Sequence, residues 1–318
     1  MNQNLSVAIP PTALVARLTH WSSAAQGAFA ANTERAYVVD SRTFASWCGT
    51  EGLAMLPAEP STVAAFLRAE SEAGKAVSTV RRRAATIARL HRAAGLANPC
   101  DSEVVRLALK AIARERGTQQ RQAGPLTAKD AHRIQCMIGA DASLKDHRDL
   151  ALLLVGKDLL ARASELVALT VDAVRFDVDD GTAHVALRRH KTSTEPQDCL
   201  LGPDAAGALR RWLREAGITS GAVFQSITKG GHVTGTALSV RDVGRILKDL
   251  ASRAKLDPAQ VSSHSMRVGT AVDCIAANID AASIMQAGGW TSVRMVARYT
   301  SKLAAKRGAI ARLHKLTG

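Results

Sequence analysis

Hydrophobic residues recur at helical spacing along the first third of the chain. Tyr37, Phe44 and Trp47 lie on one face of a predicted helix that Asn32 would cap, and this face is expected to be core. Serine and glycine residues, which favour the beginnings and ends of helices, delimit further predicted helices over 61–74, 78–95 and 102–116. No strand pattern interrupts them. The pattern therefore predicts a small all-helical domain.

Two polar segments bound this helical region. Residues 1–20, which include two adjacent prolines, are expected to form a flexible arm, so the helical domain would span residues 21–116. Residues 117–127 contain Gln, Gly and Pro without an apolar period and are expected to form a linker. A second domain is expected over residues 128–318.

The second domain contains one region with strand character. Thr127 is expected to begin a helix, and a strongly apolar helix is predicted over 146–160. Strands are predicted over 171–176, 184–187 and 197–201, with an Asp-Asp-Gly turn between the first two. The remainder is predicted to be helical. The expected fold is therefore mainly α, with a helical N-terminal domain and a mixed α/β C-terminal domain that carries a small antiparallel sheet.

Composition adds a charge and excludes several classes of protein. The 318 residues carry 42 Lys and Arg against 28 Asp and Glu, a net charge of +14, and both domains share the surplus. A basic surface over two domains favours nucleic acid as the partner, although a basic housekeeping enzyme is the alternative. The apolar content of 47% excludes a disordered chain, and neither a membrane helix nor a secretory signal is visible. We expect a soluble cytoplasmic protein associated with the nucleoid.

Cofactor motifs are missing from the sequence. The five cysteines are scattered without a CxxC pair, and His184 and His190 lack a third ligand nearby, so neither a disulfide framework nor a zinc site is predicted. The phosphate-binding motif of nucleotide triphosphatases does not occur either. We expect no metal and no cofactor.

Two sets of residues are candidates for DNA contact. On the helix predicted over 78–95, one face is apolar, consisting of Val80, Ala84, Ile87 and His91. The opposite face carries Ser78, Arg82 and Arg89, donors suited to phosphates and base edges. Arg241 and Arg245 have the same four-residue spacing on a later predicted helix. For both sets, an ordinary solvated arginine face is the alternative.

The candidate catalytic residues are concentrated near the C-terminus. His264 and Arg267 are three residues apart on a predicted helix, so their side chains share one face. The chain contains two tyrosines, Tyr37 and Tyr299. Because Tyr37 is expected in the core, Tyr299 is the better candidate for chemistry.

These residues occur in strings that resemble the tyrosine recombinase (phage integrase) family. The strings are His264-Ser-Met-Arg267-Val-Gly, then Ile284-Met-Gln-Ala-Gly-Gly-Trp290-Thr, then Tyr299 nine residues later. Arg162-Ala-Ser-Glu165-Leu resembles the first arginine motif of the family, and Lys191-Thr resembles its β-hairpin lysine. One departure is Leu160-Ala161, where the family usually has Gly-Leu or Leu-Leu before the arginine. A lone His-x-x-Arg would be weak, but this order and spacing over most of the chain is specific.

The resemblance implies a role for each residue of the set. Arg162 and Arg267 would bind the non-bridging oxygens of a backbone phosphate, and Tyr299 would attack it to leave a 3′-phosphotyrosine. The remaining implied roles are a hydrogen bond or proton removal by His264, protonation of the leaving 5′-oxygen by Lys191, an N–H donor from Trp290, and orientation of the cluster by Glu165. Taken singly, each has a structural alternative: a helix salt bridge for Arg162 and Glu165, a solvated lysine, a capping histidine, and packed aromatic residues.

The resemblance also implies a fold and an assembly. The N-terminal domain would be a SAM-like core-binding domain and the C-terminal domain the catalytic one. Double-stranded DNA with inverted-repeat arms would bind a dimer, two dimers would pair as a tetramer through a four-way junction, and a helix over about 302–316 would dock on a neighbouring subunit. Arg241 falls at the position of a base-reading arginine. Accessory proteins, a non-catalytic DNA-binding regulator and a type IB topoisomerase-like enzyme remain open.

Overall fold

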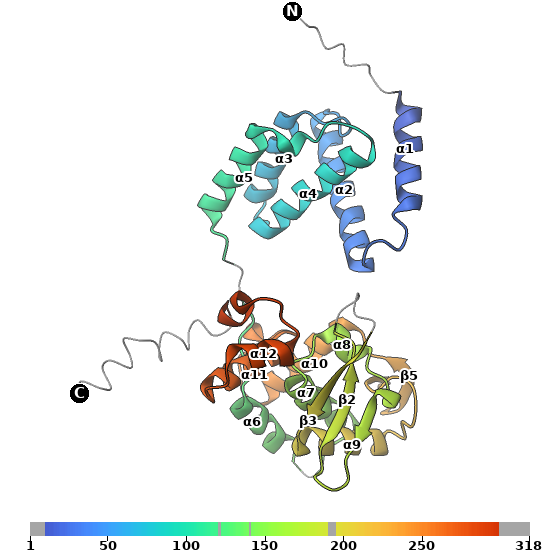
Figure 1. The fold of residues 1–318 in the computed structure, drawn as a ribbon, viewed down its shortest axis with the longest axis vertical. Coiled ribbons are helices and arrows are strands. Elements are labelled where there is room, and N and C mark those ends of the chain that lie inside the picture. The colour runs from blue at the N-terminus through green and yellow to red at the C-terminus, as the bar shows by residue number, and fades with distance from the viewer. Residues whose placement is uncertain (1–9, 120–121, 140, 190–194, 299–318) are drawn as a thin grey trace, which may run out of the picture. The chain divides into compact units, whose positions relative to one another are not determined.

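The computed structural model describes residues 10–119, 122–139, 141–189 and 195–298. The chain divides into two compact units, Met1–Arg121 and Gln122–Gly318, and this division falls within the segment 117–127. The first unit is helical and the second mixes helices with two small antiparallel sheets, so the mainly α class expected from the sequence is confirmed (Figure 1). In the described ranges, no helix is long and apolar enough to cross a membrane.

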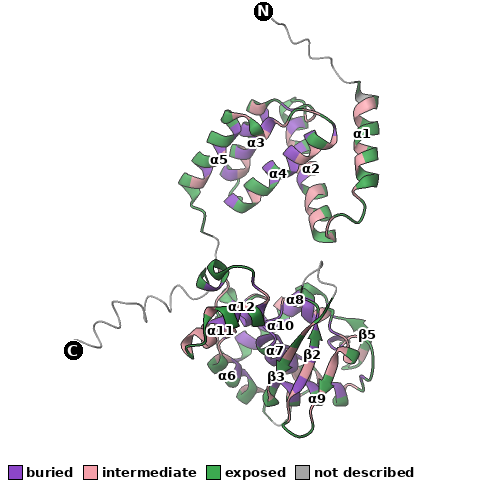
Figure 2. Cartoon of the chain, in the orientation of Figure 1, coloured by how far each residue is buried: buried purple, intermediate pink, exposed green. Residues whose placement is uncertain are grey.

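The first unit packs its helices around one core. Its elements are α1 (Pro11–Ala24), α2 (Ala31–Glu51), α3 (Pro60–Glu72), α4 (Val77–Ala93), a 3₁₀ turn (Pro99–Asp101) and α5 (Glu103–Arg116). Phe44, Phe66 and Ile87 are buried from three different helices, and purple inner faces mark this core in Figure 2. The apolar face predicted for α4 is confirmed, because Val80, Ala84, Ile87 and His91 are all buried.

Helix α1 corrects the expected flexible arm over residues 1–20. The chain is helical from Pro11, whose fixed φ suits the first position of a helix. Two contacts hold the helix against the unit: the Trp21 ring lies 6.3 Å from the Phe29 ring, and Arg17 donates to the carbonyl of Ala94 at 3.0 Å. Residues 1–9 lie outside the described residues.

Other helix starts in this unit also differ from the prediction. Helices α2, α3 and α4 begin at Ala31, Pro60 and Val77, one residue before the expected caps Asn32 and Ser61 or Ser78, and no capping side chain is bonded there. Tyr37, in the second turn of α2, is half-buried and lies outside the buried core cluster, so its assignment to the core was wrong.

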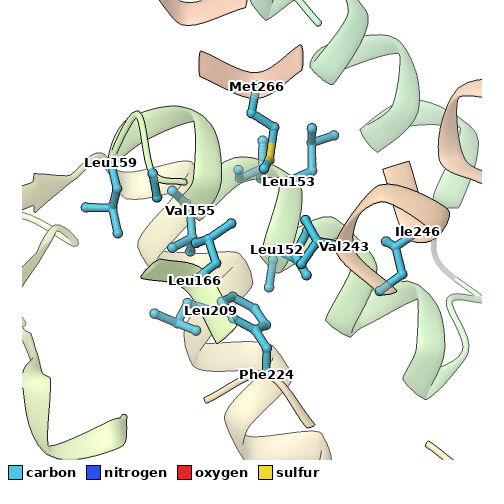
Figure 3. Close-up of a cluster of buried hydrophobic side chains, with 14 of the residues drawn as sticks. Leu152, Leu153, Val155, Leu159, Leu166, Leu209, Phe224, Val243, Ile246 and Met266 are labelled. Carbon is cyan, nitrogen blue, oxygen red and sulfur yellow. The ribbon is translucent and has the colours of Figure 1, made fainter. Parts of the chain in front are cut away.

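The second unit is built on helices α6 (Ala128–Ile138), α7 (Leu144–Asp158), α8 (Ala163–Val167), α9 (Pro203–Glu215), α10 (Val240–Arg253), α11 (Ser265–Ala276) and α12 (Ala281–Gly288), with residues 293–298 also helical. Thr127 caps α6 in a reciprocal pair with Asp130, as predicted. Two 3₁₀ turns, Val171–Ala173 and Pro258–Gln260, complete the helical elements. In helix α7 the consecutive residues 151–157 are all buried, which explains its continuous apolar run, and Leu152, Leu153 and Val155 lie in the core shown in Figure 3.

Two antiparallel sheets belong to this unit. Strands β1 (Val174–Phe176), β2 (Ala183–Leu187) and β3 (Gln197–Leu201) pair in that order and confirm the predicted strand region. Strands β4 (Gln225–Ile227) and β5 (Val233–Ala237) form a hairpin where continued helix was expected. The sequence did not reveal the hairpin because its strands are short and β5 is mostly exposed, without an apolar alternation.

Helix α11 crosses the chain at Gly269 with no room for a side chain. A Cβ atom there would lie 1.8 Å from the carbonyl oxygen of Leu126. The same approach allows the Leu126 amide to donate to the carbonyl of Ser265 at 2.9 Å. This contact fixes the start of α11, and therefore the backbone of Arg267.

We predict that Gly269→Ala destabilises the protein by about 1–3 kcal/mol, because Leu126 meets the new methyl group with its backbone. Gly207→Ala is the matched control. Gly207 lies on α9 with open space around its Cβ position, so alanine should stabilise by about 0.5–1 kcal/mol through helix propensity. Urea unfolding of both variants measures the two changes, and a stabilised Gly269→Ala variant would contradict the packing.

Candidate active site

Arg162 stands directly before α8 and is bonded to Glu165 twice. Its Nη1 donates to Glu165 Oε1 at 2.5 Å, and its backbone amide donates to Glu165 Oε2 at 2.7 Å. The Arg162 side chain is 35% exposed, whereas that of Glu165 is 6% exposed. The buried carboxylate therefore holds the guanidinium at the surface. The salt bridge within the helix and the orientation of Arg162 by Glu165 were alternative interpretations of the sequence. In the structure one contact accounts for both.

The turn between α7 and α8 has a strained residue at its centre. Leu160 adopts φ 43°, in the left-handed region that glycine enters at little cost. It is the first residue of the pair where Gly-Leu or Leu-Leu is usual in the family that the sequence resembles. Burial offsets the strain, because the Leu160 side chain packs in a cluster with Ile284, Trp290 and Val296.

Arg267 joins this turn to the end of α12. It is buried at 2% exposure, and its Nη2 donates to the carbonyl of Gly288 at 2.9 Å while its Nη1 donates to the carbonyl of Leu160. The guanidinium carbon also lies 4.6 Å from the centre of the Trp290 ring. Trp290 is thus both a packed aromatic residue and a direct neighbour of a candidate catalytic arginine.

His264 lies at the N-terminal cap of α11 and is exposed. Its pKa is lowered from the usual 6.5, first by partial desolvation and then by the positive charges of Arg267 and Arg162. The imidazole therefore lies within electrostatic range of both guanidinium groups. Because protonation adds a third positive charge, the neutral form is favoured at pH 7.

Two of the predicted site residues lie outside the described residues. Lys191 falls in the segment 190–194 and Tyr299 in the segment 299–318, which also contains the expected docking helix over about 302–316. Arg162, Glu165, His264, Arg267 and Trp290 are the members of the set that the structure brings together.

The DNA-contact candidates of α4 are held by contacts within their own unit. Arg82 donates to the buried Asp40 at 2.5 Å, and Arg89 lies over the rings of Phe29 and Tyr37 at 4.8 and 5.2 Å. Ser78 is exposed. Of the three side chains predicted to face DNA, Arg82 and Arg89 therefore already have partners within the protein.

The candidates of α10 lie on the surface of the second unit. Arg241 and Arg245 are exposed, and Arg245 pairs with Asp242 at 2.6 Å.

Sequence reasoning missed Arg189, a buried arginine beside the site. Its side chain is 4% exposed, and Nη1 lies 3.8 Å from Glu165 Oε2. Its backbone carbonyl accepts from Arg162 Nη1 at 3.4 Å. One signal was available: Ala183, Val185 and Leu187 alternate inward along β2, and the same alternation carries residue 189 to the inner face.

Comparisons with known proteins identify the family of the chain. The model of the phage integrase family matches residues 126–306, and that of the phage integrase N-terminal SAM-like domain matches residues 24–97. An integrase/recombinase XerD homolog of Selenomonas ruminantium is 32% identical over 277 residues, which are 84% of this chain and 81% of that protein. Recombinase Cre of Escherichia phage P1 is 30% identical over 303 residues, which are 90% and 88% of the two chains.

Solved structures of low sequence identity share the fold. The Tn1549 transposon integrase in complex with transposon right end DNA has a TM-score of 0.63 at 14% identity, and the match covers 92% of this chain and 98% of that one. A λ integrase dimer bound to a core site has a TM-score of 0.60 at 16% identity, covering 90% and 76%.

The chain therefore belongs to the tyrosine recombinase (phage integrase) family, with a SAM-like N-terminal domain and an integrase catalytic domain. It is a site-specific recombinase that acts on DNA.

We predict that the His264 imidazole titrates below pH 6.5 and that Arg162→Gln moves its midpoint upward, because one neighbouring positive charge is lost. Arg214→Gln, at an exposed arginine of α9 paired with Glu215, is the control and should leave the midpoint unchanged. Proton NMR of the imidazole over pH 4.5–8.5 provides the measurement. Equal midpoints in all three proteins would show that His264 is not coupled to Arg162.

Proposed function

We propose that this recombinase breaks and rejoins DNA strands through a covalent 3′-phosphotyrosine on Tyr299, without metal or ATP. One observation supports the proposal: Arg162, at the start of α8, lies close enough to His264, at the start of α11, to lower the pKa of the imidazole together with Arg267 of α11. Two permanent positive charges beside a largely neutral imidazole suit a phosphate that gains charge in the transition state.

Cleavage exchanges one bond to phosphorus for another. The phenolic oxygen of Tyr299 forms a bond to phosphorus, and the bond from phosphorus to the 5′-oxygen breaks. Arg162 is the more exposed of the two arginines and binds a non-bridging oxygen. The buried Arg267 adds a second positive charge beside it. Neutral His264 accepts the phenol proton, and Lys191 gives a proton to the leaving oxygen.

Rejoining reverses the same step. The phosphodiester energy is retained in the link to tyrosine, so the 5′-hydroxyl of a second strand displaces Tyr299 with no further energy source. Trp290, stacked against Arg267, and Glu165, bonded to Arg162, keep the two guanidinium groups in place through both steps. This conservation of bond energy distinguishes strand exchange from hydrolysis.

We further propose that the protein binds inverted-repeat arms of duplex DNA as a dimer and exchanges strands as a tetramer through a four-way junction. The λ integrase relative was solved as a dimer on a core site, and the Tn1549 relative with transposon end DNA. In this chain the basic surplus of both units and the surface arginines Arg241 and Arg245 supply phosphate and base contacts.

A suicide substrate tests the chemistry. The target is first located by footprinting DNA that flanks the gene, and a nicked duplex of that sequence is then incubated with wild-type protein and with Tyr299→Phe. We expect a covalent protein–DNA adduct from the wild type and none from the variant, since phenylalanine lacks the nucleophilic oxygen. Binding without an adduct from the wild type would instead identify a non-catalytic regulator.

Supercoiled plasmid without the target site provides the second arm of this experiment. The proposed recombinase should leave it supercoiled, because this plasmid contains no target site to cleave. General relaxation would identify a topoisomerase-like activity.

The assembly has its own test. Truncation after Ser301 removes the segment proposed to dock on a neighbouring subunit, so we expect single-site binding to persist while the tetramer on paired sites is lost. Gel filtration and sedimentation with target DNA measure both states. A truncated protein that still forms tetramers would overturn the docking proposal.

A further inference from the structure

We propose that Lys157 is a positioning residue for the arginine pair of the active site, because its buried ammonium group holds α11, which carries Arg267, against the end of α7, which leads into Arg162. The inference rests on the function proposed above. Lys157 takes no part in that chemistry, and its effect passes through the two helices that it joins.

One face of α11 is bonded to the end of α7 at three successive positions. Arg267 Nη1 donates to the carbonyl of Leu160, and the Thr270 hydroxyl donates to the carbonyl of Lys157 at 3.0 Å. One turn further along α11, Asp273 Oδ2 accepts from Lys157 Nζ at 3.1 Å. Residues three apart lie on the same face of a helix. The Lys157 ion pair therefore belongs to the same line of bonds as the candidate catalytic arginine.

Lys157 also binds the segment that leads into α6. Its Nζ donates to the carbonyl of Leu126 at 2.8 Å, and the Ala128 amide donates to Asp273 Oδ2 at 2.7 Å. The Leu126 amide donates in turn to the carbonyl of Ser265 at the start of α11. One ammonium group therefore links three parts of this unit: the segment before α6, the end of α7, and α11.

Close packing connects this ion pair to the active site. Gly156, next to Lys157, faces Met266, next to Arg267, and a Cβ atom at Gly156 would lie 2.8 Å from Met266 Cε. Protein interiors packed this closely transmit a displacement from one element to the next. A change in the bonds of Lys157 is therefore expected to move Arg267 relative to the end of α7.

Burial makes the loss of the ammonium group consequential. The Lys157 side chain is 9% exposed and that of Asp273 is 30% exposed. Without the ammonium group, the carboxylate loses its opposite charge and the carbonyl of Leu126 loses a donor. Buried polar groups that lose a partner are destabilising unless water reaches them. We expect water to enter at this point and α11 to move away from α7.

The titration of His264 measures such a movement. Desolvation and the charges of Arg267 and Arg162 lower the pKa of the imidazole. Arg267 is on α11 with the histidine, whereas Arg162 precedes α8. If α11 moves away, the imidazole gains water and loses the effect of Arg162, so the midpoint of its NMR titration rises.

Two variants separate a change of position from the direct effect of charge. Lys157→Met removes a positive charge, which by itself raises the midpoint of a nearby imidazole, and Asp273→Asn removes a negative charge, which lowers it. A purely electrostatic effect would therefore shift the two midpoints in opposite directions. We expect both variants to raise the midpoint of His264 by a few tenths of a pH unit, because both release α11.

Arg148→Met is the matched control. Arg148 is a cation of α7 that is as buried as Lys157, but it is bonded to the neighbouring Asp149 and to the carbonyl of Gln225 in β4. These bonds do not involve α11. The variant should leave the His264 midpoint unchanged even where it lowers the free energy of unfolding.

Adduct formation on the suicide substrate measures the effect on the reaction. We expect Lys157→Met and Asp273→Asn to slow it about tenfold or more while binding of the target DNA changes less than about threefold, since a small displacement of a catalytic group costs much of its effect. Arg148→Met should slow it to a much smaller extent.

Opposite shifts of the two midpoints, unchanged midpoints, or adduct formation at the wild-type rate would overturn the role of Lys157. If methionine prevents folding, Asp273→Asn decides alone, because only a displacement of α11 raises its midpoint. A wild-type protein that forms no adduct would instead contradict the proposed function, while the midpoints would still show whether Lys157 positions α11.

Discussion

The second unit depends on arginine side chains that satisfy the carbonyl ends of helices. The end of α7 leads into Arg162, and the end of α12 leads into Trp290, so the geometry of the site follows from how these two ends meet. Main-chain carbonyls cannot bond to one another, and a layer of apolar side chains between them would leave them unsatisfied. Guanidinium groups from Arg189 and Arg267 solve this problem, since each donates to both ends.

The same arrangement places the buried positive charges of Arg189 and Arg267 close to the more exposed Arg162. Glu165 supplies a buried carboxylate to this group, and it is shared between Arg162 at 2.5 Å and Arg189 at 3.8 Å. Desolvation is the largest cause of the lowered pKa of His264, and the excess positive charge is the second. A phosphate that enters this site meets charges that are already fixed in place, and that preorganisation is what an electrostatic catalyst requires.

In the first unit, buried charge also fixes the helix expected to meet DNA. Asp40 is 1% exposed on α2 and receives bonds from Arg82 and Thr86 of α4. Arg83 lies 3.6 Å from the same carboxylate and pairs with Glu70 of α3. The polar face of α4 is therefore connected to two neighbouring helices, and the arginines on it serve packing as well as any contact with DNA.

The sequence by itself determined the helical first unit, the three-stranded sheet, the order of the catalytic motif and the membership of Arg162, Glu165, His264, Arg267 and Trp290 in one site. The elements follow from the apolar period, which is a local property of the chain. The site residues could be grouped because they occur in strings that resemble the motifs of the family. Only the tertiary structure revealed the role of residues whose partners lie far away in the sequence. Arg189 and Asp40 look like solvated charges in sequence, and helix α1 and the β4–β5 hairpin lack a strong local pattern. Their burial and bonds arise from segments far away in the chain, because a buried charge is stable only where other parts of the fold supply its partners.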